Sequence, residues 1–142
     1  MSGPAGRDVI YLPDTNVFSR FLREKDARLR ERLEAELEFC RLSPICLFEL
    51  EYGAAKRPDL PVLRQRVERL RELIPSAGGF GDDAAFFAGR IRAQLENLRP
   101  NAQPIGPFDL LLAGQALSLG AVLVTANVRE FSRVAGLQVE NW

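Results

Sequence analysis

The apolar positions of the chain form short continuous runs that alternate with longer segments of helical spacing. Leucines and alanines cover nearly every side of the segment over residues 107–119, which predicts a helix packed inside a domain. Pro107 suits the first helical position and Gly120 suits the exit. The next run, Ala121–Thr125, is short and rich in β-branched residues, which predicts a strand buried on both faces of a parallel sheet. Asp109 therefore lies in the first turn of a buried helix, where an ionised carboxylate is costly unless a cation or hydrogen bonds compensate it.

The rest of the chain continues this alternation of strands and helices. Strands are expected at Val9–Leu12, Leu42–Ile45 and Leu137–Val139, and Pro13 ends the first. Amphipathic helices are expected at Thr15–Arg23, Ala27–Cys40, Cys46–Ala55, Leu60–Ile74 and Ala84–Leu98, the last capped by Asp82 or Asp83. The pattern predicts an α/β fold with a parallel sheet sandwiched by helices. Residues 1–8 are expected to be a disordered lead, and residues 9–142 one domain.

Composition and charge exclude several classes of protein. Nineteen basic and nineteen acidic residues balance, so the net charge does not indicate nucleic acid or membrane, although Arg outnumbers Lys heavily and suits phosphate. No apolar run has membrane-spanning length and the first ten residues lack a signal-peptide core, which predicts a cytoplasmic protein. Cys40 and Cys46 are expected to be reduced core residues. The chain has no histidine, which removes Ser-His-Asp and Cys-His catalysis and leaves carboxylates as the main candidates.

Acidic and amide side chains gather near the ends of the predicted strands. Asp14 and Asn127 each follow a strand, and the crevice of an open α/β sheet lies at the carboxyl ends of its strands. Asp109 precedes a strand by a helix, and the sequence leaves open which edge of the sheet it reaches. Glu49 lies in the middle of an apolar helix. Converging oxygen ligands without histidine predict a site for a hard cation, Mg²⁺ or Mn²⁺.

Each of these residues also has a simpler explanation. Asp14 can cap the helix that follows it, and Asp109 can complement the helix dipole. Glu49 alone can be a surface residue. Asn127 and Glu130 have the spacing of a capping box. The hypothesis of a metal site therefore depends on the residues acting together.

Three segments together resemble the PIN-domain ribonuclease toxins of the VapC type, which belong to bacterial and archaeal toxin–antitoxin pairs. The segments are YLPDTNVFSRFL, LSPICLFELEYGA and IGPFDLLLAGQALSLGAVLVTANVREFSRVAGLQVENW. Their motifs occur in the family's order and spacing, and the resemblance spans about Ile10 to Trp142. It implies a PIN-like three-layer α/β/α sandwich with a short parallel sheet and an acidic pocket that binds Mg²⁺ and cuts RNA.

The resemblance also implies a role for each residue of the pocket. Asp14 and Asp109 are expected to be the metal ligands, and Glu49 the third catalytic acid. Thr125 and Asn127 are expected to support the pocket through hydrogen bonds. Asn127 stands where many PIN domains have a fourth aspartate, which is expected at most to weaken a second metal site.

The implied partners are an RNA substrate, a cognate VapB-type antitoxin and a second copy in a homodimer, with operator DNA reached only through the antitoxin and no membrane. A groove between Cys46–Ala55 and Leu60–Ile74 is expected to receive the antitoxin. Gln115 stands where relatives often carry histidine, and no role is assigned to it. Two alternatives remain: a catalytically weak PIN fold that acts with its antitoxin in DNA-binding autoregulation, and a receiver or phosphatase domain, which the DTN motif does not favour.

Overall fold

A small parallel sheet lies at the centre of the computed structural model, which describes residues 8–98 and 105–142. The strand order is β1 (Tyr11–Pro13), β2 (Val122–Val124) and β3 (Gln138–Glu140). In the register, Leu12 pairs with Leu123 and Leu123 with Val139. The predicted α/β fold with a parallel sheet is therefore confirmed. Apart from Asp8, the lead expected over residues 1–8 lies outside the described residues.

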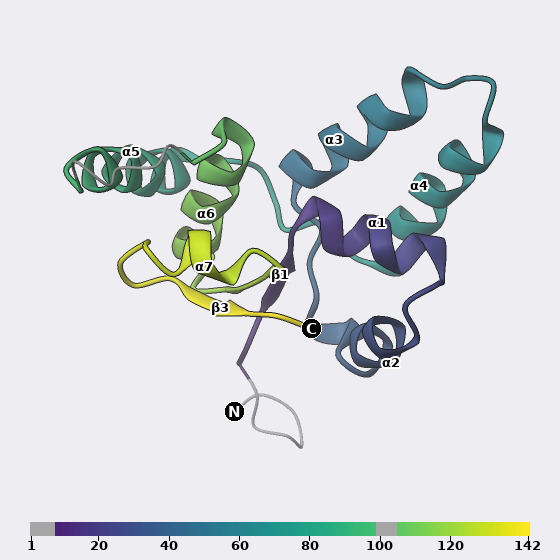
Figure 1. Cartoon of the computed structure of the whole chain (residues 1–142), viewed down its shortest axis with the longest axis horizontal. Coiled ribbons are helices and arrows are strands. Elements are labelled where there is room, and N and C mark those ends of the chain that lie inside the picture. The colour runs from purple at the N-terminus through teal and green to yellow at the C-terminus, as the bar shows by residue number, and fades with distance from the viewer. Residues whose placement is uncertain (1–7, 99–104) are drawn as a thin grey trace.

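The helices form two groups with the sheet between them (Figure 1). One group contains α1 (Thr15–Arg23), α2 (Ala27–Ala35), α3 (Pro44–Ala55) and α4 (Pro61–Leu73). The other group contains α5 (Asp82–Glu96) and α6 (Pro107–Leu119), and the short helix α7 (Val128–Phe131) follows β2. Among the helices that the structure describes, none has the length and apolar character needed to cross a bilayer.

Strands β1 and β2 are buried because helices cover both faces of the sheet, whereas β3 is partly exposed. Leu12, Leu123 and Val124 are fully buried, as the continuous apolar runs predict. Ala113 and Ala116 of α6 are also fully buried, so this helix lies inside the molecule. The two cysteines, Cys40 and Cys46, are buried and unbridged, which confirms that they are reduced core residues.

The strand expected at Leu42–Ile45 is wrong. Leu42 forms an isolated parallel bridge with Ser76, and helix α3 already begins at Pro44. Ser43 is the N-cap of α3, and its hydroxyl accepts a hydrogen bond from the Ile45 backbone N–H at 3.1 Å. A serine followed by a proline is the ordinary start of a helix, and this signal outweighs the apolar residues around it.

Two expected helix boundaries are also wrong. The helix expected over Ala27–Cys40 ends at Ala35, and a 3₁₀ turn follows at Leu37–Phe39. The expected caps of α5, Asp82 and Asp83, lie within its first turn, because Gly81 is the N-cap. Carboxylates in the first turn of a helix interact favourably with the positive end of the helix dipole. Asp82 and Asp83 therefore stabilise the start of α5 without capping it.

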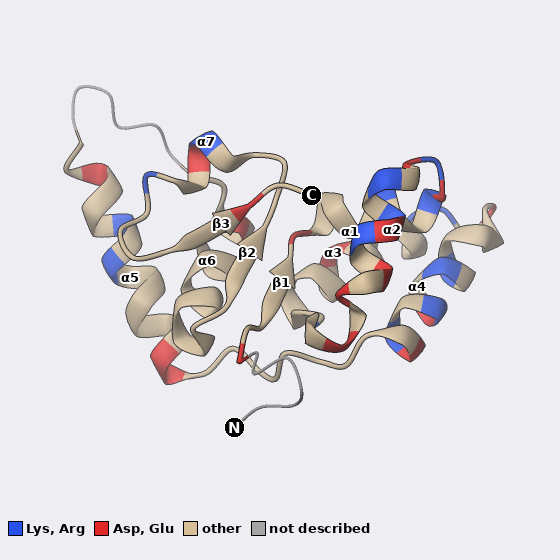
Figure 2. Ribbon diagram, turned by 90° about the horizontal axis from the view of Figure 1, so that it is seen from below, with Lys and Arg blue, Asp and Glu red and all other residues tan. Residues whose placement is uncertain are grey.

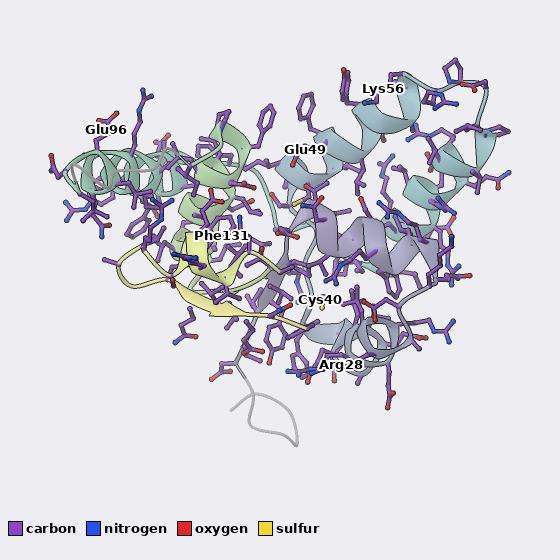
Figure 3. The ribbon with its side chains drawn as sticks, in the orientation of Figure 1. Arg28, Cys40, Glu49, Lys56, Glu96 and Phe131 are labelled. Atoms are coloured by element: carbon purple, nitrogen blue, oxygen red, sulfur yellow. The ribbon has the colours of Figure 1, made fainter. Side chains whose placement is uncertain are left out.

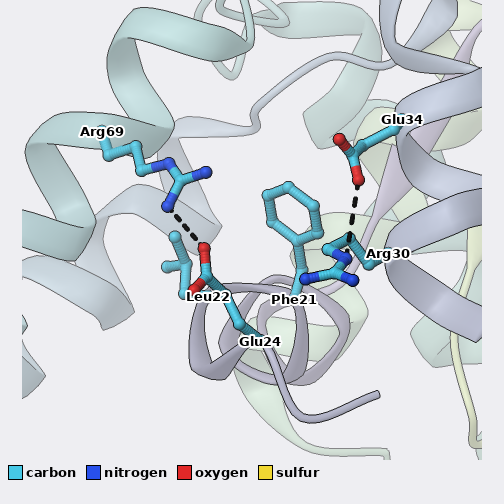
Figure 4. A pocket seen from close by; sticks show the side chains of 6 residues that line it. All are labelled: Phe21, Leu22, Glu24, Arg30, Glu34 and Arg69. Carbon is cyan, nitrogen blue, oxygen red and sulfur yellow. Dashed lines mark hydrogen bonds and ion pairs between the residues drawn. The ribbon is translucent and has the colours of Figure 1, made fainter. Parts of the chain in front are cut away.

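Two ion pairs lie near the end of α1, one that joins α4 to the C-cap of α1 and one within α2 (Figure 4). Arg69 of α4 contacts Glu24 at 2.6 Å, and Arg30 contacts Glu34 at 3.8 Å, both beside Phe21. All four charged side chains are about half exposed, and solvent screens such pairs, so each contributes little to stability. This corner of the molecule is a helix joint and offers no chemistry of its own.

Candidate active site

Asp14 stands at the carboxyl end of β1, where the sheet passes into α1. Its backbone N–H donates to the carbonyl of Val124 at 2.9 Å, which holds Asp14 beside the end of β2. Its Oδ1 accepts a hydrogen bond from the Val17 backbone N–H at 2.9 Å, so Asp14 is the N-cap of α1. The capping explanation is therefore right, but it uses one carboxylate oxygen and leaves Oδ2 for another role. Asp14 is only 7% exposed.

Glu49 faces the start of α1. Its Oε1 accepts a hydrogen bond from the Thr15 hydroxyl at 2.6 Å, and Thr15 directly follows Asp14. Figure 3 shows Glu49 in the half of α3 nearer to α6, with Lys56 at the distant end. The next acid of the helix, Glu51, forms an ion pair with Arg64 of α4. Glu49 is thus a partly buried residue held toward Asp14, which contradicts the surface explanation.

Asp109 reaches the same edge of the sheet. Helix α6 leads into β2 and runs antiparallel to it, so the start of the helix returns to the carboxyl end of the strand. Burial, together with the negative charges of Glu130, Asp14 and Glu49, raises the pKa of Asp109 to about 6. The sequence left open which edge of the sheet Asp109 reaches. Because the charges of Asp14 and Glu49 act on it, Asp109 lies at the edge where Asp14 stands. The helix dipole favours the ionised form, but burial and repulsion outweigh it.

The Cys46 thiol also lies within reach of the charges of this cluster. Cys46 is fully buried one turn before Glu49, and its Sγ donates to the carbonyl of Pro13 at 3.6 Å. The pKa of the thiol is raised to about 12, first by burial and then by the charges of Asp14, Glu49 and Asp109, although the hydrogen bond with Thr15 lowers it. The charges of the three predicted acids therefore all act on one buried thiol.

Glu130 is a fourth acid, which the sequence analysis assigned to a capping box. The box is wrong, because the Asn127 side chain donates its Nδ2 hydrogen to the Glu130 carboxylate. Among the negative charges that raise the pKa of Asp109, the charge of Glu130 has the largest effect. Thr125 is fully buried, and its Oγ1 accepts from the Asn127 backbone N–H at 3.0 Å. Thr125 and Asn127 thus shape the turn that carries Glu130.

Compensating cations are missing from the described part of this cluster. Within residues 8–98 and 105–142, neither Lys nor Arg forms an ion pair with Asp14, Glu49, Asp109 or Glu130. The basic side chains gather mainly on α1, α2 and α4 (Figure 2). No ion pair among the described residues therefore offsets the burial and the repulsion that raise the pKa of Asp109.

The donor set fits a hard divalent cation. It consists of carboxylate oxygens, which Mg²⁺ and Mn²⁺ prefer, and its negative charge is unpaired. Among the described residues, however, no three Asp, Glu or Cys side chains already lie close enough to one point to hold an ion. The carboxylates therefore form an acidic cluster whose side chains would have to rotate inward around a bound ion.

The acidic cluster should make the metal-free protein less stable as pH rises. The pKa of the Asp109 carboxyl is about 6 in the folded state and 3.8 when unperturbed, because burial and the charges of Glu130, Asp14 and Glu49 disfavour its ionised form. The protonated Asp109 carboxyl makes its full contribution to the free energy of unfolding below about pH 4. This contribution is lost as the pH rises through about 6. Thermal unfolding in EDTA should show this loss between pH 4 and 7, and Mg²⁺ should reduce it. A midpoint that rises over this range would contradict the prediction.

Comparisons with known proteins agree with this architecture. A family model described as PIN domain matches residues 11–137. The tRNA(fMet)-specific endonuclease VapC of Shigella flexneri is 38% identical over 136 residues, which cover 93% of this chain and 97% of the relative. The structure of VapBC2 from Rickettsia felis bound to a promoter DNA fragment has 29% identity and a TM-score of 0.84, with 94% and 99% coverage. DNA-bound VapBC from Salmonella typhimurium has 34% identity and a TM-score of 0.84, with 94% and 98% coverage.

Proposed function

Because the chain belongs to the PIN-domain family, we propose that it is a Mg²⁺-dependent endoribonuclease toxin of the VapC type, controlled by a VapB-type antitoxin. The observation that carries this proposal is the cluster of Asp14, Glu49, Asp109 and Glu130 without a cationic partner among the described residues. Related proteins are named ribonuclease VapC, and two are named tRNA(fMet)-specific endonuclease VapC. The family assignment makes the receiver or phosphatase interpretation wrong.

The proposed mechanism divides the work among the acids. Asp14, through the oxygen that does not cap α1, and Asp109 would hold the cation. When bound, Mg²⁺ supplies positive charge opposite the scissile phosphate and lowers the pKa of a water. The Thr15 hydroxyl fixes one oxygen of Glu49, so the other can orient the attacking water and accept its proton. A protein nucleophile is not required, which agrees with a chain that has no histidine.

Cleavage by the purified protein tests this function. The tRNA(fMet) transcript is the first substrate to use, because a relative is named for it. We expect cleavage with Mg²⁺, complete loss with EDTA, and recovery when Mg²⁺ or Mn²⁺ is restored in excess. Cleavage that persists in EDTA would contradict the metal-dependent mechanism, and a folded protein inactive on tRNA, rRNA and mRNA would contradict the nuclease assignment.

The antitoxin is expected to bind a groove that begins at the acidic cluster. The groove has a volume of about 310 Å³ and runs from Thr15 and Glu49 between α1, α3 and α4. Apolar side chains from all three helices line it, including Leu22, Leu50 and Val67. An amphipathic helix or extended tail fits such a groove, and an arginine at its end would pair with Glu49 and neighbouring carboxylates.

Substitution in the groove checks this partner assignment. Leu50→Asp should weaken binding of the co-expressed antitoxin at least about tenfold, because it places a charge in a desolvated contact. Calorimetry with the purified antitoxin would measure the change. A complex structure in which the antitoxin leaves this groove open would contradict the proposal. Homodimer formation, and contact with operator DNA only through the antitoxin, stay predictions.

The alternative function is a catalytically weak PIN fold that acts with its antitoxin in DNA-binding autoregulation. The observation that favours it is Asn127 in place of an acid. Glu130 weakens this argument, because it brings a carboxylate to Asp109 from the same turn. The cleavage experiment separates the two functions, since a binding module would give no metal-dependent products.

A further inference from the structure

Gln115 lies in the interior of α6 and joins three segments that are far apart in sequence. It is only 1% exposed. Its Oε1 accepts a hydrogen bond from the Ser43 hydroxyl at 2.5 Å, and its Nε2 donates to the carbonyl of Gly78 at 3.0 Å. Ser43, the N-cap of α3, is fully buried. The side chain of Gln115 therefore connects α6, the start of α3 and the loop before α5.

The donors and acceptors of this network allow one arrangement. The Gly78 carbonyl can only accept, so the amide nitrogen of Gln115 must face it and the amide oxygen must face Ser43. The Ser43 hydroxyl accepts from the Ile45 N–H, so its single hydrogen is available for Gln115. Every polar atom named here has its partner, and a buried network in this condition fixes the relative position of the elements it joins.

The joined helices are the ones that carry Glu49 and Asp109. Glu49 is six residues after Ser43, and Asp109 is six residues before Gln115, which places each acid about 9 Å along its helix from the hydrogen bond. The aromatic side chains that precede the two acids, Phe48 and Phe108, also meet, with ring centroids 5.3 Å apart. Helices α3 and α6 are thus held together at a buried polar contact and at an exposed aromatic one.

We propose that Gln115 is a positioning residue for the acidic cluster. Through its bond to Ser43 it sets the spacing of α3 and α6, and thereby the spacing of Glu49 and Asp109. The inference rests on the proposed function, because the spacing matters only if Asp109 helps to hold an ion and Glu49 faces the water beside that ion. A network of this kind acts on metal affinity, since groups that orient ligands commonly change it by about 10-fold or more.

The test compares two substitutions of glutamine by methionine. Gln115→Met keeps the length of the side chain and removes both hydrogen bonds, and it should raise the Kd for Mn²⁺ about tenfold. Gln94→Met is the matched control, because Gln94 of α5 also bonds to backbone, at Arg133 and Ala135, but does not join α3 to α6. Its Kd should stay within about twofold of wild type. Calorimetric titration of the full chain with Mn²⁺ gives the Kd separately from the number of sites.

Measuring the Kd for Mn²⁺ distinguishes a displaced acidic cluster from a general loss of folded protein. A smaller folded fraction lowers the apparent number of sites and leaves the Kd unchanged, whereas displaced ligands change the Kd itself. Should Gln115→Met fail to fold, Ser43→Gly replaces it, because glycine is an acceptable N-cap and still breaks the bond to Gln115. The same tenfold rise is then expected.

The two proposals fail in different ways. Wild-type protein that cleaves RNA and binds Mn²⁺, together with a folded Gln115→Met variant of unchanged Kd, would overturn the positioning role alone. An equal rise of the Kd in Gln115→Met and Gln94→Met would overturn it as well. Wild-type protein that neither binds Mn²⁺ nor cleaves RNA would overturn the proposed function and the positioning role with it.

Discussion

Replacing Asp109 by asparagine is expected to lower the rate of RNA cleavage about 1,000-fold and to raise the stability of the metal-free protein. The loss follows from the proposed mechanism, because the amide would remove one of the charges that hold a cation expected to supply several kcal/mol of transition-state stabilisation. The gain follows because Asp109 is ionised at neutral pH although it is partly buried and faces the charges of Glu130, Asp14 and Glu49. After allowance for solvent screening, relief of this repulsion contributes about 1 kcal/mol.

Cleavage rates with saturating Mg²⁺ and thermal unfolding in EDTA at pH 7.5 measure the two effects. An increase of about 4 °C in the unfolding midpoint, together with lost activity, would exclude misfolding as the cause. Glu51→Gln is the matched control, since it removes one negative charge from the neighbouring acid of α3, which pairs with Arg64 away from the cluster. Its activity should stay within about twofold of wild type. Asp109→Asn with a tenth of the wild-type activity would contradict the assignment.

The sequence predicted the arrangement of the fold because its strongest patterns are local. Continuous apolar runs become the buried strands β1 and β2, and the segment that is apolar on nearly every side becomes the interior helix α6. The strand expected at Leu42–Ile45 fails because a short apolar run suits a strand or a helix equally well. The capping signal of Ser43 was the information that decides between them.

The acidic site was predictable in part, for a different reason. Spacing after strands placed Asp14 at the crevice, and only the family resemblance brought Asp109 there. The sequence did not indicate that Glu130 belongs to the acidic cluster, because a Glu three residues after an Asn is fully explained by a capping box. Its effect on Asp109 depends on the fold of the α7 turn, which local sequence does not specify. Buried polar partners such as Ser43 and Gln115 are likewise separated by many residues and become neighbours only in three dimensions.

A methyl group added at Gly114 is expected to destabilise the fold by about 2 kcal/mol. Gly114 lies in α6 where α5 crosses closest to it. A Cβ at this position would lie 2.8 Å from the carbonyl oxygen of Ala84, 2.8 Å from the Cβ of Ala88 and 2.9 Å from the backbone nitrogen of Ala88. Two of these atoms are backbone and the third is fixed to it, so a rotamer change cannot relieve the contact. Helix α5 must move away from α6, which opens the packing between two buried surfaces.

Gly89→Ala provides the same chemical change where the structure has room for it. Gly89 lies in the exposed face of α5, and apart from its own helix backbone and chain neighbours, no described heavy atom would lie within 4 Å of its Cβ. Alanine there should stabilise the protein by about 0.5–1 kcal/mol, because it lowers the entropy of the unfolded chain. Thermal unfolding should therefore place the midpoint of Gly114→Ala roughly 8 °C below wild type and that of Gly89→Ala a few degrees above it. Equal unfolding midpoints for the two variants would mean that α5 can move away from α6 at no cost in stability. The close contact at Gly114 would then not stabilise the packing of the two helices.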